Sequence, residues 1–316
     1  MGFNMLPKLT ALTVFLGLFL LVFAVFPAEA WLRKSDPEEK TLTYDGVKRV
    51  YILHVPESVL ASRKKVPLVL MLHGGGGNDA NGVKMTQFSD KADKEGFIVA
   101  YPSGSGRFAN VLKTWNFWHC CGYSIRNNTD DSGFLSALID QLVKDYPVDP
   151  HKVFVTGMSN GAMMSHRAGI DLSNKIAAIA PVVGTMFGDE PRAKGPVAAL
   201  IINGTDDTQI KLDGGANNSR FKSAWDGTPM KPALWQSQYW AKINGCKPEP
   251  HKVQYKKDVT VYDYDCPKGK DVRHFIITGG THSWPGGRPG RKGGATPSTA
   301  INATDEIWAF FMEMTK

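Results

Sequence analysis

The segment Gly157-Met158-Ser159-Asn160-Gly161 contains the residue whose surroundings point most directly to chemistry. An apolar, β-branched run precedes it and a segment with helical spacing follows it, which places the serine on a turn between a strand and a helix. So tight a turn leaves no room for side chains at its flanks and therefore needs both glycines. The turn would hold the hydroxyl above the edge of a sheet, and the helix N-terminus would point N–H groups at a developing oxyanion. We predict that Ser159 is a nucleophile.

A serine hydroxyl is a weak nucleophile at neutral pH and needs a general base, which a neutral imidazole held by a carboxylate supplies. After a turn of this kind the acid comes next in the chain and the histidine last. Three histidines lie far enough downstream. His251 precedes a basic stretch, and His274 lies inside a predicted strand, where a structural role is expected. His282 follows that strand in a Gly-rich turn that would carry an imidazole over the sheet edge, so we predict that it is the base. His73 precedes the serine, and we expect it to brace its own loop.

The carboxylate should follow an earlier strand of the sheet. The loop directly after the predicted strand Val197–Ile202 contains Asp206 and Asp207, and both are candidates. Adjacent side chains point in different directions, so at most one of the two faces the imidazole and the other is left to cap the turn. Spacing alone does not separate them.

A four-glycine loop, Gly74–Gly77, follows the predicted strand Val66–Leu72. Glycines let the backbone approach a substrate closely and turn N–H groups toward it. We expect the oxyanion donors to be the backbone N–H of Asn160 and that of either Gly74 or Gly75. A phosphate-binding role is disfavoured because the Gly-Lys-Ser/Thr ending of a P-loop is absent.

The elements that must position these residues alternate along the chain. Apolar, β-branched runs alternate with longer segments of helical spacing, a pattern typical of a mostly parallel sheet with helices on both faces. The chain is therefore predicted to be an α/β protein with its site at the carboxyl ends of the strands. The predicted strands are Val47–Val55, Val66–Leu72, Phe97–Tyr101, Val153–Val155, Ile176–Val183, Val197–Ile202 and Val272–Ile277, and the predicted helices are Asn81–Glu95, Ser132–Tyr146, Gly161–Ile170, Pro232–Ile243 and Ala300–Met314.

Composition separates the first 30 residues from the rest. The chain has 316 residues, a net charge of +7 and 42% hydrophobic residues, which excludes a disordered tail, a small disulfide scaffold and a collagen-like fibre. Lys8 is followed by the apolar stretch Leu9–Phe26 and by Ala28-Glu29-Ala30, the small-x-small pattern of a signal-peptidase site. We predict that residues 1–30 are a secretory signal and residues 31–316 a single catalytic domain, extracellular or periplasmic. A retained membrane anchor is the alternative, because about 18 apolar residues are at the lower limit of a bilayer span.

Four cysteines in an exported chain favour disulfides, and no C-x-x-C or His/Cys cluster with zinc spacing occurs, so no metal or cofactor is expected. Cys246 and Cys266 flank a segment that we interpret as two connected strands, and we predict that they pair. Cys120 and Cys121 are adjacent. A bridge between neighbours strains the peptide unit that joins them, so a vicinal disulfide is not expected.

Several motifs in this order resemble those of the polyhydroxybutyrate-depolymerase and feruloyl-esterase family of secreted α/β-hydrolases, which includes LpqC-like esterases and carbohydrate esterase family 1. The resemblance runs from about Val47 to the end of the chain. Its motifs are Leu72–Gly77, Val99–Pro102, Cys120–Gly122, Asp130–Phe134, Gly157–Ala162, Gly204–Asp207 and Gly279–Gly286.

The resemblance implies an α/β-hydrolase fold and a catalytic triad of Ser159, Asp207 and His282. It favours Asp207 over Asp206 because the family pattern is Gly-Thr-x-Asp. The chain departs from the pattern at Asn203, where the family commonly has His, and the usual Pro after the aspartate is missing. The family therefore does not define the shape of the neighbouring pocket.

These observations lead us to expect a secreted serine carboxylic-ester hydrolase with an acyl-enzyme intermediate, acting on feruloyl or acetyl esters of plant polysaccharide. The alternative within the same chemistry is a polyhydroxybutyrate or other hydroxyalkanoate polyester depolymerase. A prolyl-oligopeptidase-like serine peptidase is disfavoured because no propeller-length block is present. A non-catalytic binding protein is disfavoured because all three triad residue types occur in order.

Aromatic and basic residues complete the set of candidates. An aromatic group in a long loop contains Trp115, Phe117, Trp118 and Tyr123, and Trp284 adjoins the predicted base. Such rings can stack on a hydroxycinnamoyl group or a sugar, and we name Trp115, Trp118 and Trp284 as substrate-binding candidates, with ordinary packing as the alternative. The basic loop of residues 288–292 is expected to be solvated, with an acidic polysaccharide as an alternative contact. The remaining charge is spread along the chain, so we expect no nucleic-acid partner, no stable membrane association after signal cleavage, and a monomer.

Overall fold

The computed structural model describes residues 1–2, 36–62, 64–216, 224–290 and 293–315. The chain divides into the unit Met1–Arg33 and the compact unit Lys34–Lys316, and the second is described here. Apart from its first two residues, the predicted secretory segment 1–30 lies outside the described residues. Within the described part of the chain, no helix is long and apolar enough to cross a bilayer.

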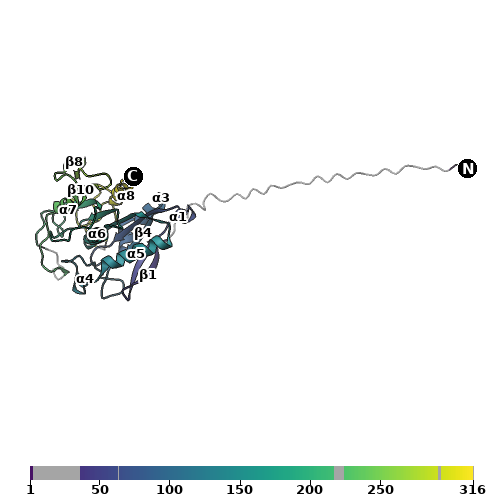
Figure 1. Ribbon diagram of the computed structural model, residues 1–316, viewed down its shortest axis with the longest axis horizontal. Coiled ribbons are helices and arrows are strands. Elements are labelled where there is room, and N and C mark those ends of the chain that lie inside the picture. The colour runs from purple at the N-terminus through teal and green to yellow at the C-terminus, as the bar shows by residue number, and fades with distance from the viewer. Residues whose placement is uncertain (3–35, 63, 217–223, 291–292, 316) are drawn as a thin grey trace. The chain divides into compact units, whose positions relative to one another are not determined.

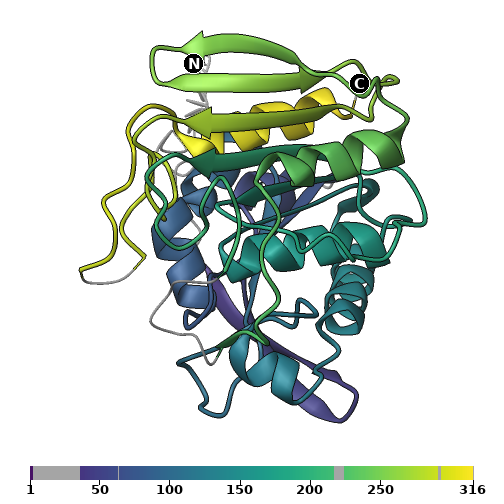
Figure 2. The same cartoon turned by 90° about the vertical axis from the view of Figure 1, so that its left-hand side faces the viewer.

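One mixed sheet forms the centre of the second unit (Figure 1). Its strands are β1 Glu38–Tyr44, β2 Val47–His54, β3 Val66–Leu72, β4 Ile98–Pro102, β5 Val148–Met158, β6 Ala178–Val182, β7 Ala198–Gly204, β8 His251–Lys256, β9 Val259–Tyr264 and β10 Val272–Ile277. They lie in the order β1-β2-β4-β3-β5-β6-β7-β10-β9-β8. Every neighbouring pair from β4 to β10 is parallel, whereas β1 and β2 at one edge and β9 and β8 at the other are antiparallel (Figure 2).

The strand sequences follow from these positions. The central strands β4, β6 and β7 are buried at every residue, as expected of parallel strands covered on both faces, and they are near-continuous apolar runs. Strand β2, nearer the edge, alternates between buried and less buried residues, and the edge strand β8 is exposed throughout. In a sheet of this kind, a functional site is expected at the carboxyl ends of the buried parallel strands.

Helices cover both faces of the sheet and complete two apolar cores. They are α1 Glu57–Ser62, α2 Asp79–Thr86, α3 Phe88–Glu95, α4 Gly122–Arg126, α5 Asp131–Asp145, α6 Asn160–Asp171, α7 Leu234–Asn244 and α8 Ala303–Glu313. Helices α5, α6 and α7 share one core with one face of the sheet, and α2, α3 and α8 share the other core with the opposite face. This arrangement confirms the predicted α/β class with a mostly parallel sheet.

The structure differs from the predicted elements in a few places. The single helix predicted over Asn81–Glu95 is two helices, because Gln87 between α2 and α3 adopts a left-handed conformation with φ 57° and closes a hydrogen bond from its N–H to the carbonyl of Val83. No glycine or proline marks that break in the sequence. Strand β1 and the short helices α1 and α4 were also missed, because mostly exposed or single-turn elements carry little hydrophobic periodicity.

Both cysteine pairs form disulfides. The Cys246–Cys266 bond joins the end of α7 to the end of β9, and the segment between them is the β8–β9 hairpin. Cys120 and Cys121 are also bonded to each other, through a cis peptide unit, contrary to the expectation from strain. Both cysteines are buried at the end of the long loop between β4 and α4.

Replacing Cys246 and Cys266 together by Ser should lower the free energy of unfolding by about 3 kcal/mol, because the bond closes a loop of 20 residues in the unfolded chain. Urea denaturation of the two proteins under oxidising conditions measures the difference. Each single Ser variant should lose about as much as the double variant, since either change removes the same bond. Equal stability of the double variant and the parent protein would contradict this account.

Candidate active site

The turn between β5 and α6 carries Ser159 in a left-handed conformation with φ 56°, and its N–H donates to the carbonyl of Val182 at 3.0 Å. A Cβ atom on Gly157 would lie 2.5 Å from the carbonyl oxygen of Gly161. One on Gly161 would lie 2.2 Å from the carbonyl oxygen of Leu72. Both glycines are thus required by the close approach of the backbone.

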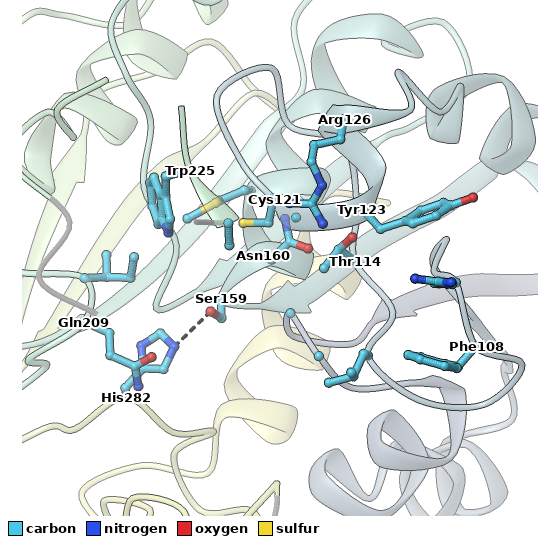
Figure 3. Close-up of a pocket in the computed structure, with 18 residues that line it drawn as sticks. Phe108, Thr114, Cys121, Tyr123, Arg126, Ser159, Asn160, Gln209, Trp225 and His282 are labelled. Carbon is cyan, nitrogen blue, oxygen red and sulfur yellow. Dashed lines mark hydrogen bonds between the residues drawn. The ribbon is translucent and has the colours of Figure 1, made fainter. Parts of the chain in front are cut away.

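A continuous chain of contacts runs from Ser159 to a buried carboxylate. Oγ of Ser159 lies 2.9 Å from Nε2 of His282, and Nδ1 of that ring lies 2.7 Å from Oδ2 of Asp207 (Figure 3). Asp207 is only 3% exposed, and its Oδ1 accepts the backbone N–H groups of Gln209 and Ile210, both at 2.8 Å. The three residues follow β5, β7 and β10, so parallel strands bring their loops to one sheet edge.

Asp206 points away from this chain of contacts. Its side chain is exposed, its Oδ1 accepts the hydroxyl of Thr205 at 2.8 Å, and its N–H donates to the carbonyl of Gly280. Asp206 therefore caps the turn. The carboxylate beside the imidazole is the one that the family resemblance favours.

The other downstream histidines do not reach Ser159. His274 is fully buried in β10 with Nε2 3.0 Å from Oδ1 of Asn203, and burial, aided by nearby His166, lowers its pKa to about 3. His251 is exposed on β8 and lies 3.2 Å from a carboxylate oxygen of Asp265. The structure thus gives His274 the structural position expected for it.

His73 braces the glycine loop, as expected. Its Nδ1–H donates to the carbonyl of Gly74 at 2.8 Å, and its Nε2 accepts the N–H of Gly104 at 2.9 Å. Burial lowers its pKa to about 4, although the bond to Gly74 opposes that shift, so the ring is neutral at physiological pH. A neutral ring can both donate and accept, which this position demands.

The glycine loop and the start of α6 face each other across the serine. Gly75 lines the pocket beside Ser159 and Asn160, whereas Gly74 does not, and the N–H of Gly76 already donates to the carbonyl of Lys113 at 2.7 Å. The side chain of Asn160 is held by two hydrogen bonds to the backbone of Trp115, 2.7 Å and 3.0 Å long. These two bonds fix Asn160, and with it the start of α6, against the loop that contains Trp115.

A pocket of about 490 Å³ opens over the serine. Figure 3 shows Trp225 on the His282 side of the pocket and Phe108 and Tyr123 on the other side, with the Ser159–His282 hydrogen bond between them. Its apolar walls also include Leu112, Met163 and Ile210, and two arginines, Arg107 and Arg126, contribute charge to the lining.

The tryptophans predicted to contact substrate do not line this pocket, so that expectation is wrong. Trp115 and Trp284 are completely buried. The indole N–H of Trp115 donates to the carbonyl of His73 at 3.0 Å, and that of Trp284 donates to Thr304 Oγ1 at 3.1 Å. Trp118 is half-buried, and the guanidinium of Arg167 lies 5.0 Å from the centre of its ring. These rings pack within the protein and stabilise their loops. Their positions in the sequence did not distinguish packing from substrate contact.

The rings that do line the pocket are Tyr123 of α4, Phe108 and Trp225, and the last two come from segments without regular structure. Phe108 is 53% exposed in the loop after β4, and Trp225 lies beyond β7 in a segment without helical or strand periodicity. No motif adjoins Trp225, and only the tertiary fold brings it to the serine. Of the basic loop 288–292, residues 291–292 lie outside the described residues, and Arg288 does not line the pocket. Within the described residues, no group of three His, Cys, Asp or Glu side chains could hold a metal ion.

Residues 49–219, more than half of the chain, match the sequence family described as Esterase PHB depolymerase. The chain is 28% identical over 253 residues to a bifunctional acetylxylan esterase/xylanase from Neocallimastix patriciarum, covering 79% of this chain and 31% of that protein. It is 27% identical over 234 residues to feruloyl esterase B from Piromyces equi, covering 72% of this chain and 41% of that protein. The chain therefore spans less than half the length of these two relatives.

A solved structure shares the architecture. The acetyl xylan esterase from Aspergillus awamori superimposes with a TM-score of 0.61 at 16% identity, covering 87% of this chain and 99% of that one. At this level of identity the similarity shows a common fold. It agrees with the α/β-hydrolase arrangement of the sheet and with helices on both faces.

Three buried histidines should make the protein sensitive to acid. Burial lowers the pKa of His73 and His166 to about 4 and that of His274 to about 3, whereas an unfolded histidine titrates near about 6.5. Above that pH both states are neutral. As the pH falls toward 4, the unfolded chain takes up protons that the native state rejects, so stability falls by up to about 1.4 kcal/mol per pH unit for each histidine.

Urea denaturation at about pH 7 and about pH 5 measures this loss. His166→Gln should reduce the pH dependence, and the matched variant His251→Gln, at an exposed position, should leave it unchanged. Equal free energies of unfolding at the two pH values would contradict the buried, neutral assignment.

Proposed function

This chain belongs to the esterase PHB depolymerase family, and from that premise we propose that it is a secreted serine carboxylic-ester hydrolase. Ser159 is the nucleophile, His282 the general base, and Asp207 the carboxylate that orients the ring and stabilises its protonated form. The observation that carries the proposal is the unbroken series of contacts of 2.7 Å and 2.9 Å from the carboxylate to the hydroxyl, which ends inside an apolar pocket.

The reaction is a double displacement. Nε2 of His282 removes the proton of Ser159 Oγ as that oxygen attacks the ester carbonyl carbon, and a tetrahedral intermediate forms. Collapse breaks the bond to the alcohol, which leaves with the proton from Nε2, and an acyl-Ser159 ester remains. Water then attacks the acyl carbon as Nε2 of His282 takes its proton, and a second tetrahedral intermediate forms. Its collapse breaks the bond to Ser159 Oγ, which takes the proton back from Nε2, and the carboxylic acid leaves.

The negative oxygen of the intermediate binds between two backbone donors, the N–H groups of Asn160 and Gly75. The first opens α6, where the helix dipole favours negative charge. We take Gly75 rather than Gly74 as the second donor because, of these two residues, only Gly75 lines the pocket with the serine. Loss of one such donor lowers turnover by about 100- to 1000-fold in serine hydrolases.

The substrate is a feruloyl or acetyl ester of plant polysaccharide. Two relatives named for acetylxylan and feruloyl ester hydrolysis support this class, and the pocket of about 490 Å³ favours an acyl group larger than acetyl. A hydroxyalkanoate polyester or its oligomers is the second candidate, which the description of the matching family supports.

The protein acts outside the cytoplasm, in the extracellular space or the periplasm, after removal of residues 1–30. Its two disulfides support an oxidising compartment. Residues 31–316 are then one catalytic domain, which we propose to be a monomer.

Ser159→Ala should lower ester hydrolysis by at least about 10⁴-fold, because the covalent path is lost, while the circular dichroism spectrum stays unchanged. The measurement is a rate panel of the parent protein and the variant with methyl ferulate, acetylated xylan and 3-hydroxybutyrate oligomers. Retained activity in the variant would sink the nucleophile assignment. The substrate with the highest kcat/KM in the parent protein decides between polysaccharide esters and polyester.

Asp207→Asn should lower kcat by about 10³- to 10⁴-fold, because an amide cannot hold the imidazole in its productive tautomer or stabilise its charge. The neighbouring Asp206→Asn is the matched control and should change kcat by less than about threefold, since the Asp206 side chain bonds the adjacent Thr205 hydroxyl and points away from the imidazole. Steady-state kinetics with p-nitrophenyl butyrate measures both. A larger loss in Asp206→Asn would place the acid one residue earlier.

A further inference from the structure

Trp225 is held in the pocket wall by contacts with the loop after β4. It forms an antiparallel bridge with Cys120, and the N–H of the next residue, Asp226, donates to the carbonyl of His119 at 3.1 Å. Farther along, Met230 pairs with Gly215 in a second bridge. The segment from Ala224 to Met230 therefore depends on a few local contacts for its position.

His119 contacts two carboxylates, and one of them, Asp226, belongs to this segment. Its Nδ1 lies 2.6 Å from Oδ2 of Asp226 and its Nε2 lies 2.9 Å from Oδ2 of Asp189, while Thr228 Oγ1 lies 3.1 Å from Nδ1. Carboxylates only accept, so both ring nitrogens can bond in this way only when both carry protons. The geometry is that of an imidazolium between two anions.

One phenylalanine connects this ion triple to the pocket wall. The ring of Phe187 meets the His119 ring edge to face at 4.9 Å and the Trp225 ring edge to face at 5.5 Å. Phe187 is itself only 4% exposed and lies beside Phe117. A shift of His119 would thus reach Trp225 both through Asp226 and through Phe187.

We propose that Trp225 determines the acyl-group selectivity of the pocket for an aromatic acyl group, and that His119, bound between Asp226 and Asp189, is the positioning residue that holds it there. The inference rests on the proposed ester hydrolysis. An indole on the His282 side of the pocket offers a planar surface to an aromatic ring of the acyl group, and offers little to a short aliphatic chain.

The clamp formed by His119, Asp189 and Asp226 depends on pH. Burial lowers the pKa of His119, but hydrogen bonds to Asp226 and Asp189 outweigh it, so the pKa is raised. For Asp226 burial raises the pKa, and hydrogen bonds from Thr228 and His119 outweigh that, so it is lowered and the group stays ionised. Among the described residues, the charged groups that contact the ring are these two aspartates, and its neighbour Phe187 is apolar. The clamp is therefore complete in mildly acidic solution and weakens as the pH rises through the raised pKa of His119.

Steady-state kinetics with two methyl esters tests the proposal. Methyl cinnamate has an aromatic acyl group without a titrating phenol, and methyl butyrate has the same alcohol with an aliphatic chain. Trp225→Ala and His119→Gln should raise KM for methyl cinnamate by about three- to tenfold with kcat nearly unchanged, and should leave methyl butyrate within about twofold. Trp225→Phe should restore most of the affinity. The matched control is His251→Gln, another histidine paired with an aspartate, which should change neither ester.

The pH profile separates positioning from a merely structural role. In the parent protein KM for methyl cinnamate should rise as the pH increases above the ordinary histidine pKa of about 6.5 and passes through the raised pKa of His119, and in His119→Gln it should be high and flat. Asp226→Asn, at a half-exposed position, is a second variant with the same expected effect. Equal losses on both esters, or an unchanged KM for methyl cinnamate, would overturn the proposal.

Binding distinguishes failure of this inference from failure of the proposed function. Calorimetry of methyl cinnamate with the Ser159→Ala protein, alone and combined with His119→Gln, needs no turnover. A Kd raised about three- to tenfold by the second substitution supports the clamp even if the parent protein hydrolyses neither ester. Equal Kd values would reject it.

Discussion

The turn that carries Ser159 lies directly against the backbone at the end of β3, and the rest of the site takes its position from that contact. Leu72 at the end of β3 is paired with Gly157, and a side chain on Gly161 would collide with the Leu72 carbonyl. Because the two strands are parallel and adjacent, the glycine loop after β3 must emerge beside the start of α6. One close backbone contact thus sets Ser159, the N-terminus of α6 and the Gly75 backbone within the same small space, and it tolerates no Cβ atom at either flank.

A buried polar network places the other two members of the contact chain. Oδ1 of Asn203 lies within hydrogen-bond distance of His274 and Gln236, and Gln236 in turn bonds His166, whose other nitrogen accepts the indole N–H of Trp240. These residues belong to β7, β10, α6 and α7, so the network links the two strands that lead to Asp207 and His282. Unpaired polar groups at such depth would be costly, and each partner therefore restricts the next. The Asn at position 203, where the family commonly has His, serves this network below the site and does not line the pocket.

The residues that form the pocket walls are held less firmly than Ser159, Asp207 and His282. Phe108, Tyr123 and Trp225 come from the long loop after β4, from α4 and from the segment after β7, and no shared strand register relates them. A clamp of charged side chains at partly exposed positions can hold such a segment, but its strength depends on protonation and solvent screening. Substrate selectivity in this protein is therefore expected to vary with conditions, whereas the geometry around Ser159 does not.

The amino-acid sequence by itself determined the parts that depend on local pattern: the buried strands, most of the helices, the Gly157–Gly161 turn, and the placing of Ser159, the Asp206–Asp207 pair and His282 in loops that follow strands. Those features repeat with the strand or helix period or sit directly after a strand, so a short window contains them. Spacing did not separate Asp207 from Asp206, the family resemblance favoured Asp207, and the structure places that side chain beside the imidazole. Only the tertiary structure decided that Trp115 and Trp284 are packing residues and that Trp225 lines the pocket. Each of these outcomes depends on the direction in which a side chain leaves a loop, and that direction is set by contacts between segments distant in the chain.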